Sequence, residues 1–421
     1  MSSNCQLLIV GAGAAGLGAA HAALHKGLDF KIVEASHRVG GRGLTEELAP
    51  GIPWDLGCHW LHSRSINPLA KVADQLDLHY DNGLSSRGFY LKGQWLSEPE
   101  RNDYQEYSNK IWQNIKESAG KSADEKNADV ALSDFIDLDS RWAPYYVYWQ
   151  SLMTSNDVDC FSALDLTRYK DTDENWPVRD GYGALLEKHA SAFDISLNTQ
   201  VEDIDWGGDR IKVTTNRGQI DAENVIVTVS TGVLAAHDIN FNPVLPVDQQ
   251  EAIASLPLGC YNNFAMLYKE DWPFGPDTPE RIDYSNGDDI NFALKLNCSG
   301  WPYIYCAVAG RQAKWLERQP LAESENLLMG ALVDIFGSDI KKKITKFRAS
   351  AWGDDPLIKG AYSASKPGCA DQRGVLAAPI AEKLYFAGEA CSERAFCTAH
   401  GAWETGRDAV EKIATASNTV N

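Results

Sequence analysis

The N-terminal strand, glycine loop, helix and second strand constrain the fold of this chain more than any other feature. An apolar strand runs directly into Gly11, Gly13 and Gly16, whose spacing is G-x-G-x-x-G, and a helix of small residues follows. A second strand at 30–33 ends before Glu34. This order is typical of a dinucleotide-binding unit built on parallel strands, so the sequence predicts an α/β fold.

Each element of this unit has a physical role. The first glycine permits the tight turn, the second lets backbone N–H groups approach a pyrophosphate, and the third lets the helix pack closely on the strand. The helix N-terminus contributes partial positive charge near the phosphates. Glu34 follows the glycines by about 20 residues, as expected of a carboxylate that binds ribose hydroxyls. The alternative, an ordinary glycine-rich turn, does not require the complete order of elements.

Arginines and glycines just after the second strand narrow the choice of dinucleotide. Arg38 and Arg42 flank Gly40 and Gly41. A guanidinium can bind phosphate oxygens through two parallel hydrogen bonds, which a nicotinamide site does not need. This stretch resembles the flavin-containing amine oxidase family, whose members include monoamine oxidases, polyamine oxidases, L-amino-acid oxidases and the lysine-specific histone demethylase.

The resemblance spans nearly the whole chain. Residues 384–392 and 398–406 resemble the family's second flavin segment, and 176–183 and 352–363 match further landmarks. The resemblance implies a Rossmann-like FAD-binding domain interleaved with an α+β substrate domain that contains a mixed antiparallel sheet and helices. The positions that it implies for FAD binding are Gly11, Gly13, Gly16, Glu34, Arg42, Gly57, Trp60, Val201, Trp352, Gly388, Glu389 and Ala399.

The order of patterns along the chain predicts that the FAD-binding domain is interrupted twice. A helical, aromatic-rich stretch lies between 78 and 169, alternating strands occupy 256–310, and an amphipathic helix is expected at 323–336. The FAD-binding domain is therefore predicted to comprise 1–78, 177–255 and 346–421, and the substrate-binding domain 79–176 and 256–345.

The amino-acid composition limits the classes of protein to which this chain can belong. The 421 residues are 44% hydrophobic, which is enough for a large core. No apolar run approaches the roughly 20 residues of a membrane span, and the first strand begins too early to leave room for a signal peptide. The nine cysteines are scattered without a Cys-x-x-Cys pair, so neither a disulfide framework nor a metal site is indicated. We expect a cytoplasmic enzyme without membrane association.

The strongly acidic balance of charge also limits the partners. The net charge is −19. Such a surface favours solubility, and alternatively it concentrates cationic substrates near the protein. Nucleic acid is excluded as a partner because phosphate binding needs clustered lysines and arginines, which no segment supplies.

The resemblance implies an oxidation in which the α-carbon of a neutral amine gives a hydride equivalent to the flavin. Tyr362 falls on one position of the family's aromatic cage and Thr398 on the opposite one, so the cage would be one-sided. The alternative for Tyr362 is an ordinary buried tyrosine. His62 coincides with a histidine at the substrate entrance of animal-type polyamine oxidases, and its alternative is a hydrogen-bonded structural histidine.

Two positions depart from relatives in the family. Asn263 stands where the family has a lysine that holds a water beside the flavin and assists the reaction with oxygen. Asparagine can still anchor a water, but it cannot supply the positive charge. Ala361 stands where monoamine oxidases have the cysteine that is linked to the flavin. We therefore expect non-covalent FAD and a slow reaction with oxygen.

Together these features predict a FAD-dependent amine oxidoreductase. Its substrate would be a small polyamine-like or secondary amine whose C–N single bond is oxidised to an imine. Oxygen, which would give hydrogen peroxide, or another acceptor would take the electrons. One alternative is a carbon–carbon desaturase or mutase of the same fold, which would lack a cage tyrosine in Gly-x-Tyr-Ser. The other is a non-catalytic FAD-binding protein, which reduction of the flavin by any amine would exclude.

Overall fold

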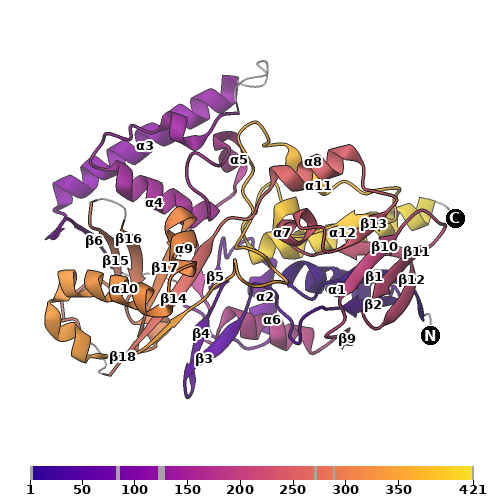
Figure 1. The fold of residues 1–421 in the computed structure, drawn as a ribbon, viewed down its shortest axis with the longest axis horizontal. Coiled ribbons are helices and arrows are strands. Elements are labelled where there is room, and N and C mark those ends of the chain that lie inside the picture. The colour runs from indigo at the N-terminus through magenta and orange to yellow at the C-terminus, as the bar shows by residue number, and fades with distance from the viewer. Residues whose placement is uncertain (1–2, 82–85, 122–128, 270–272, 288–289, 420–421) are drawn as a thin grey trace.

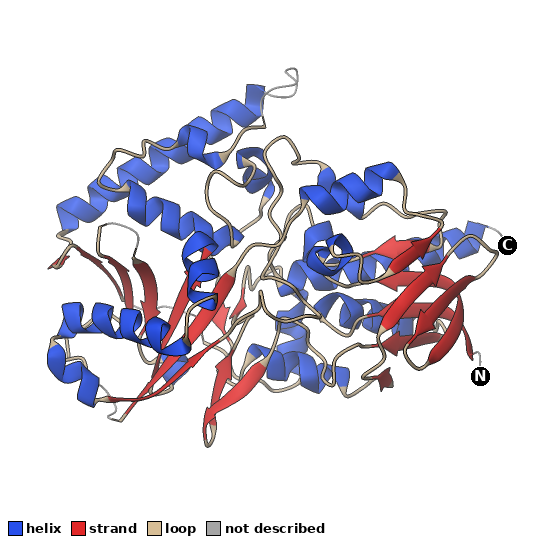
Figure 2. Cartoon of the chain, in the orientation of Figure 1, coloured by secondary structure: helices blue, strands red, loops and turns tan. Residues whose placement is uncertain are grey.

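The fold contains two large β-sheets with helices packed around them (Figure 1). The computed structural model describes residues 3–81, 86–121, 129–269, 273–287 and 290–419. The first sheet lies near both ends of the chain, and the second lies on the opposite side of the molecule. Figure 2 shows strands and helices contributing to both halves, and the predicted α/β class is confirmed.

The first sheet contains the predicted dinucleotide-binding unit. Its strands are β1 (Ser3–Val10), β2 (Phe30–Val33), β9 (Ile195–Ser196), β10 (Val201–Asp205), β11 (Ile211–Thr215), β12 (Gly218–Val227), β13 (Asn240–Asn242) and β19 (Leu384–Phe386). They are arranged in the order β13-β10-β11-β12-β1-β2-β9, with β19 paired to β12. The central strand β1 is parallel to both neighbours, as the glycine-loop unit requires.

Two glycines allow close packing around this sheet. Helix α1 (Ala14–Lys26) follows the glycine loop, and helix α12 (Ala399–Thr419) lies against it. A Cβ at Gly16 would lie 1.9 Å from the carbonyl oxygen of Gly11, and a Cβ at Gly406 would lie 1.9 Å from that of Ala15. No other residue fits at either position, so glycine brings α1 onto the end of β1 and α12 onto α1.

The second sheet is mainly antiparallel. Its strands are β6 (Arg87–Leu91), β7 (Gln94–Trp95), β14 (Tyr261–Tyr268), β15 (Arg281–Ser285), β16 (Asn291–Lys295), β17 (Tyr303–Ala309) and β18 (Ile344–Ala349). Their order is β18-β14-β17-β16-β15-β6-β7. All the neighbours are antiparallel except β6 and β15, which run parallel.

The two faces of the second sheet differ because successive strand residues point to opposite sides. Phe264 and Met266 of β14 pack in one core with Leu328 of helix α10 (Leu321–Phe336) and Leu316 of helix α9 (Gly310–Glu317). Helix α4 (Ala143–Thr154) contacts β15, β16 and β17. Its Trp149 lies 4.5 Å from the Arg281 guanidinium, on the face that borders the cavity described below.

Two small sheets and seven further α-helices complete the described part of the fold. Two small sheets pair β3 (Thr45–Ala49) with β4 (Ile52–Asp55) and β5 (Trp60–Leu61) with β8 (Trp176–Pro177). The remaining helices are α2 (Pro68–Gln75), α3 (Glu98–Lys121), α5 (Ala163–Arg168), α6 (Tyr182–Ala190), α7 (Thr231–Ala235), α8 (Val247–Ser255) and α11 (Gln372–Leu376).

Several predicted elements can be compared directly with these bounds. The strand expected at 30–33 is β2, and the amphipathic helix expected at 323–336 is α10, which begins at Leu321. The predicted domain boundary between 345 and 346 falls inside β18, which belongs to the second sheet. The division into two discontinuous domains stays a prediction.

Candidate active site

A cavity of about 1250 Å³ is lined by residues of both large sheets. At one end lie Gly11, Gly13 and Glu34 of the glycine-loop unit. At the other end the lining includes Tyr261 of β14 and Lys295 of β16. One continuous space therefore joins the predicted dinucleotide site to the second sheet.

The Glu34 carboxylate is fixed by two backbone groups. One oxygen accepts a hydrogen bond from the Ala12 N–H at 2.7 Å, and the other accepts one from the Ser36 N–H at 2.8 Å. Burial raises the pKa of Glu34, although these hydrogen bonds oppose the rise. A carboxylate oxygen can accept more than one hydrogen bond, so Glu34 retains acceptor capacity for the ribose hydroxyls that the sequence predicts.

Arg42 and Glu389 are joined directly. Arg42 Nη1 lies 3.1 Å from Glu389 Oε1, and it also donates a hydrogen bond to the carbonyl of Ala361. The Glu389 carboxylate accepts further hydrogen bonds from Ser363 N at 3.1 Å, Ser363 Oγ at 2.8 Å and Cys397 N at 3.1 Å. The pair therefore holds the backbone on both sides of Tyr362.

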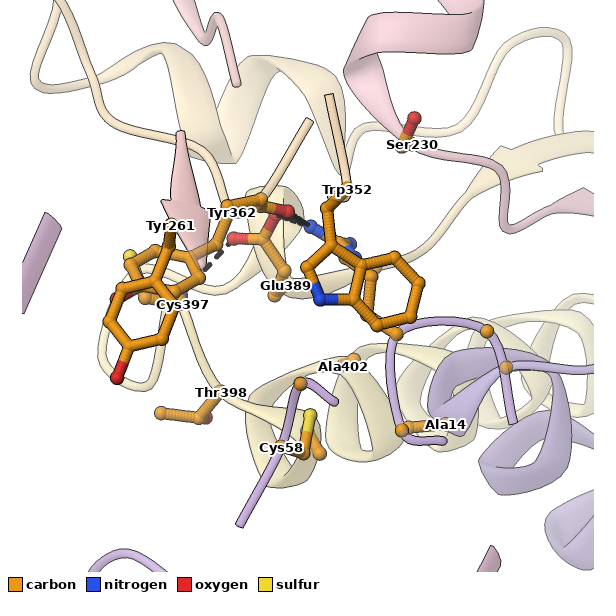
Figure 3. A pocket seen from close by; sticks show the side chains of 18 of the residues that line it. Ala14, Cys58, Ser230, Tyr261, Trp352, Tyr362, Glu389, Cys397, Thr398 and Ala402 are labelled. Carbon is orange, nitrogen blue, oxygen red and sulfur yellow. Dashed lines mark hydrogen bonds and ion pairs between the residues drawn. The ribbon is translucent and has the colours of Figure 1, made fainter. Parts of the chain in front are cut away.

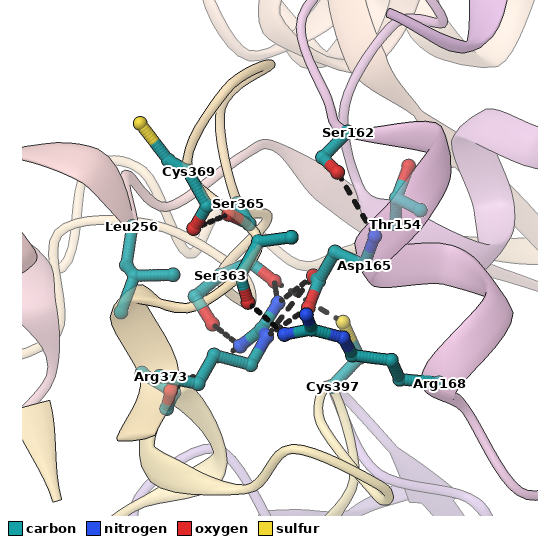
Figure 4. A network of polar contacts seen from close by, with 12 residues as sticks. Thr154, Ser162, Asp165, Arg168, Leu256, Ser363, Ser365, Cys369, Arg373 and Cys397 are labelled. Atoms are coloured by element: carbon teal, nitrogen blue, oxygen red, sulfur yellow. Dashed lines mark hydrogen bonds and ion pairs between the residues drawn. The ribbon is translucent and has the colours of Figure 1, made fainter. Parts of the chain in front are cut away.

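A second buried arginine extends this network (Figure 4). The Arg373 side chain is fully buried, and its Nη1 donates to Ser363 Oγ at 3.0 Å. Its Nε and Nη2 donate to the Asp165 carboxylate of α5 at 2.9 to 3.1 Å. Burial opposes the charge on Arg373, but the Asp165 carboxylate outweighs it and raises the pKa of the guanidinium. Every charge in this network has a partner of opposite sign.

Tyr362 lies in the cavity wall beside a second tyrosine (Figure 3). The ring centroids of Tyr362 and Tyr261 are 5.5 Å apart. The Tyr362 hydroxyl donates to the carbonyl of Leu152, and burial raises its pKa well above the usual value. The ring orientation is therefore fixed, and the hydroxyl is not available as an acid or base.

Thr398 also lines the cavity, but its hydroxyl is occupied. Thr398 Oγ1 donates to the carbonyl of Ala395 at 2.6 Å and accepts from the N–H of Gly401 at 3.0 Å. The second contact caps the N-terminus of α12. Thr398 can therefore present bulk to the cavity at the position expected for the opposite wall of the cage.

His62 borders the cavity near the β5 and β8 pair. Its Nδ1 lies 2.5 Å from Asn175 Oδ1. Burial lowers the pKa of His62, and the contact with Asn175 opposes this change only in part. The imidazole is thus hydrogen bonded, as the structural alternative requires, and it also faces the cavity, as the entrance role requires.

Asn263 is the predicted catalytic position that the structure does not place in the cavity lining. Its side chain is fully buried. The amide nitrogen donates to the carbonyls of Gly57 at 3.1 Å and Asp55 at 3.4 Å, and the amide oxygen accepts from the Tyr305 hydroxyl at 2.5 Å. Gly57 and Tyr305 do line the cavity, so Asn263 lies directly behind the wall. Its expected role beside the flavin stays a prediction.

A row of buried side chains, Asp55, His59 and Cys298, supports Tyr305, and His59 also lines the cavity. Asp55 Oδ2 lies 2.9 Å from His59 Nδ1, and His59 Nε2 lies 3.3 Å from Cys298 Sγ. Burial disfavours a charged His59, but Cys298 and Asp55 outweigh it and raise the pKa of the imidazole to about 9. The His59 ring is stacked on Tyr305 with centroids 5.0 Å apart. The Tyr305 ring is therefore held in one orientation, in which its hydroxyl bonds Asn263 and the residue lines the cavity.

The other predicted positions come together around the same space. Those that line the cavity are Gly11, Gly13, Glu34, Arg42, Gly57, Trp60, His62, Val201, Trp352, Tyr362, Gly388, Glu389, Thr398 and Ala399. Gly16 does not, because its role is the packing of α1 described above.

Sequence reasoning missed two cations of the cavity wall. Arg281 of β15 and Lys295 of β16 both line it. Lys295 is only 8% exposed, although it follows the apolar run Phe292, Ala293 and Leu294. A lysine within a buried strand is uncommon, so its place in this apolar run was the sequence signal that could have marked Lys295 as a candidate site residue.

Comparison with known proteins finds similarity to amine oxidases and to lysine-specific histone demethylases. Residues 14–414 match the family described as flavin containing amine oxidoreductase. The chain is 30% identical to polyamine oxidase 4 of Oryza sativa subsp. japonica, over 98% of this chain and 89% of that protein. It is 27% identical to lysine-specific histone demethylase 1 homolog 2 of the same organism, over 98% of this chain and 57% of that protein.

Solved structures share the fold. Cyclohexylamine oxidase from Brevibacterium oxydans IH-35A superposes with a TM-score of 0.83 at 20% identity, covering 98% of this chain and 99% of that chain. Putrescine oxidase bound to putrescine gives a TM-score of 0.82 at 18% identity, covering 99% of this chain and 100% of that chain.

The residues at the nucleotide end of the cavity fit FAD. Gly13 precedes α1, whose N-terminus has no capping side chain, and Ala14 and Ala15 of its first turn line the cavity. A Cβ at Gly13 would meet only the Gly41 Cα, at 3.9 Å. Free backbone N–H groups and open space therefore coincide where a pyrophosphate would bind. Among the residues with described coordinates, no group of three potential ligands could hold a metal ion, and no helix is long and apolar enough to cross a membrane.

Proposed function

This chain belongs to the flavin-containing amine oxidoreductase family, and we propose that its cavity binds a polyamine-like or secondary amine against the flavin between Tyr362 and Thr398. The protein is a flavin-dependent amine oxidoreductase, and its FAD is proposed to be held non-covalently, since Ala361 stands where monoamine oxidases have the cysteine that is linked to the flavin. When bound, FAD supplies the acceptor for the hydride equivalent that leaves the α-carbon of the amine. Water then hydrolyses the resulting imine.

The fixed orientation of Tyr362 is the observation that carries this proposal. Its backbone carbonyl accepts hydrogen bonds from Gly259 N at 2.9 Å and Ser155 Oγ at 2.8 Å. Arg42 and Glu389 hold the adjoining residues. A ring held at both its hydroxyl and its backbone can position an amine with little loss of entropy on binding. Tyr362 and Tyr261 therefore serve to orient the reacting carbon.

The cavity wall also selects the protonation state of the amine. Burial away from water disfavours an ammonium that has no anionic partner, and cation–π contact with the tyrosine rings offsets only part of this cost. The amine is therefore favoured in its neutral form, which is the form that can lose a hydride equivalent. No protein group has to remove a proton from the α-carbon in this mechanism.

Oxygen is the proposed electron acceptor, and the product would then be hydrogen peroxide. The neutral Asn263 side chain cannot stabilise the anion formed when oxygen accepts an electron as well as a lysine would. The proposal therefore includes slow reoxidation by oxygen, and another acceptor would replace oxygen if this rate were too low. We also propose a cytoplasmic location, which the absence of cysteine pairing in the sequence favours.

Anaerobic mixing of the holoenzyme with a panel of amines tests the proposal. At least one amine should bleach the flavin. Tyr362→Ala should slow this reduction by about 10- to 100-fold while FAD stays bound, because the lost ring positions the reacting carbon. Tyr362→Phe keeps the ring and is the matched control, for which we expect a smaller effect.

Two results would contradict this account. If the amine reduces the flavin as fast in Tyr362→Ala as in the native protein, then Tyr362 serves in packing and does not position the substrate. A flavin that no amine reduces, although dithionite does, would favour a non-catalytic FAD-binding protein or a desaturase of the same fold.

A further inference from the structure

Two like charges stand next to each other in the cavity wall. Arg281 of β15 and Lys295 of β16 are directly opposite in the antiparallel pairing. Both side chains line the cavity, so they project from the same face of the sheet. Directly opposite residues have Cβ atoms about 5 Å apart, and like charges at this distance destabilise a sheet. An unfavourable pair of this kind requires an explanation.

Neither cation has a carboxylate as hydrogen-bond partner. Lys295 Nζ lies 4.4 Å from the centroid of the Trp60 ring, and within the described parts of the chain no acidic side chain lies within ion-pair distance of it. The Arg281 guanidinium lies 4.5 Å from the Trp149 ring, and its nearest carboxylate oxygen is Asp283 Oδ1 at 3.8 Å. The Trp60 face therefore holds Lys295 in place without neutralising it, and Arg281 keeps one long ion pair, to an Asp283 carboxylate that Arg87 shares.

Asp283 accepts a hydrogen bond from a third cation, Arg87. Arg87 pairs with Arg281 on the neighbouring strand β6, and Arg87 Nε lies 2.5 Å from Asp283 Oδ2. The other oxygen, Oδ1, accepts no hydrogen bond from the described residues. Three adjacent strands thus carry three cations and one carboxylate, and the two cations that face the cavity are the ones left without a hydrogen-bonded anion.

Other acidic groups near the cavity have partners or are exposed. Glu34 and Glu389 lie at the nucleotide end and are hydrogen bonded as described above. The Cys298 thiol contacts His59. Asp171 and Asp173 border the cavity but are exposed to solvent, where charges are screened. In the described parts of the chain, Asp283 is therefore the carboxylate within ion-pair distance of these cations. Burial opposes ionisation of Cys298, but His59 and Lys295 outweigh it and lower the pKa of this thiol, so Lys295 also interacts with a buried acid.

We propose that Lys295 and Arg281 bind an anionic group of the substrate, and that the amine oxidised here carries a carboxylate. This inference rests on the proposed function, since it names the substrate class of the same cavity. Two adjacent cations can share one carboxylate, which has two oxygens and accepts charge-assisted hydrogen bonds from both. The bound carboxylate would relieve the repulsion between them.

The sheet order places the carboxylate away from the reacting nitrogen. Tyr261, which contacts the Tyr362 ring, is on β14. Strand β17 separates β14 from Lys295, and Arg281 lies one strand further. Because neighbouring strands are about 4.8 Å apart, several bonds should separate the amine from the carboxylate. A substrate with only positive charges, such as a polyamine, would bring an ammonium toward two cations.

The test compares matched acids and amides on the native holoenzyme. The probes are N-methylglycine and the N-methyl ω-amino acids with four, six and eight carbons, each with its primary amide, and spermidine as the purely cationic amine. Anaerobic stopped-flow absorbance gives the ratio kred/Kd for each. We expect one of the longer acids to exceed its own amide and spermidine by roughly tenfold or more, because its carboxylate gains charge-assisted hydrogen bonds.

Substitutions of Lys295 and Arg281 test whether these two cations cause the preference for acid over amide. Lys295→Met and Arg281→Met should reduce the preference for acid over amide to within about twofold, while Lys295→Arg should retain it. Lys116→Met is the matched control, since Lys116 is an exposed lysine of α3 that also borders the cavity. The inference is overturned if acid and amide react equally in the native enzyme, or if spermidine is preferred and Lys295→Met leaves that preference unchanged.

A binding measurement separates this inference from the proposed function. Isothermal titration calorimetry with hexanoate, which has no amine, should show binding to the oxidised holoenzyme and at least tenfold weaker binding to Lys295→Met. If hexanoate binds in this way but no amine reduces the flavin, the anion site stands and the proposed function fails. If amines reduce the flavin without preference for acids and hexanoate does not bind, the proposed function stands and the anion site fails.

Discussion

The arginines and lysines at the two ends of the cavity differ in whether a carboxylate of the protein is hydrogen bonded to them. At the nucleotide end, Arg42 is paired with Glu389, and Arg373 behind it is paired with Asp165. At the second sheet, Lys295 and Arg281 rest on aromatic rings and have no hydrogen-bonded carboxylate. A cation that is fully paired within the protein holds the fold, whereas a cation that is held in place but not neutralised is available to a ligand.

The largest effect is expected from breaking a paired charge. Arg373→Met leaves the Asp165 carboxylate buried without its partner, and this should lower the free energy of unfolding by about 3–5 kcal/mol. Denaturant unfolding measures the change. Arg407→Met removes a solvent-exposed ion pair with Asp408 and is the control, with an expected change below about 1 kcal/mol. Equal stability of the two variants would contradict the structural role of the Arg373 network.

The next largest effect tests the nucleotide end itself. Gly13 has an ordinary φ of −78°, and a Cβ there would lie 3.9 Å from the Gly41 Cα, an ordinary van der Waals contact. Gly13→Val should therefore fold but block the pyrophosphate, and the purified protein should contain little FAD by absorbance. Gly330→Val in α10, where an added Cβ has no atom of another part of the described chain within 4 Å, is the control. A full complement of FAD in Gly13→Val would show that the phosphate site is elsewhere.

An unpaired cation should contribute little to stability. Lys295→Met removes the repulsion from Arg281 and loses the contact with Trp60, and these two effects oppose each other at about 1 kcal/mol each. We expect unfolding free energy within about 1 kcal/mol of the native value, far from the loss in Arg373→Met. A loss of similar size in both variants would remove the contrast between the two ends of the cavity.

The smallest effect concerns Asn263. Asn263→Lys should accelerate reoxidation of the flavin by oxygen, because an ammonium stabilises the anion that forms, while reduction by the amine changes less. The gain should be modest, since the native amide is buried and its nitrogen is bonded to the carbonyl of Gly57. Stopped-flow measurement separates the two half-reactions. Rapid native reoxidation that the substitution does not increase would show that Asn263 does not limit the reaction with oxygen.

The sequence predicted the nucleotide end better than the second sheet, for a physical reason. Gly11, Gly13 and Glu34 belong to one short unit, so their spacing determines how they meet. Arg281 and Lys295 are neighbours only because β15 and β16 pair in one particular register, and strand alternation alone does not reveal that register. Asn263 shows the same limit, because its distance from the cavity depends on which carbonyls its amide contacts.

The most direct test of the central claim is an anaerobic single turnover of the native holoenzyme. The account predicts that an N-methyl ω-amino acid reduces the flavin and that one equivalent of carbonyl product appears for each equivalent of flavin reduced, because hydride loss from the α-carbon is followed by hydrolysis of the imine. Product is measured after acid quenching, together with flavin absorbance before the quench. A flavin that stays oxidised with every acid, amide and amine tested, and no carbonyl product, would contradict the account.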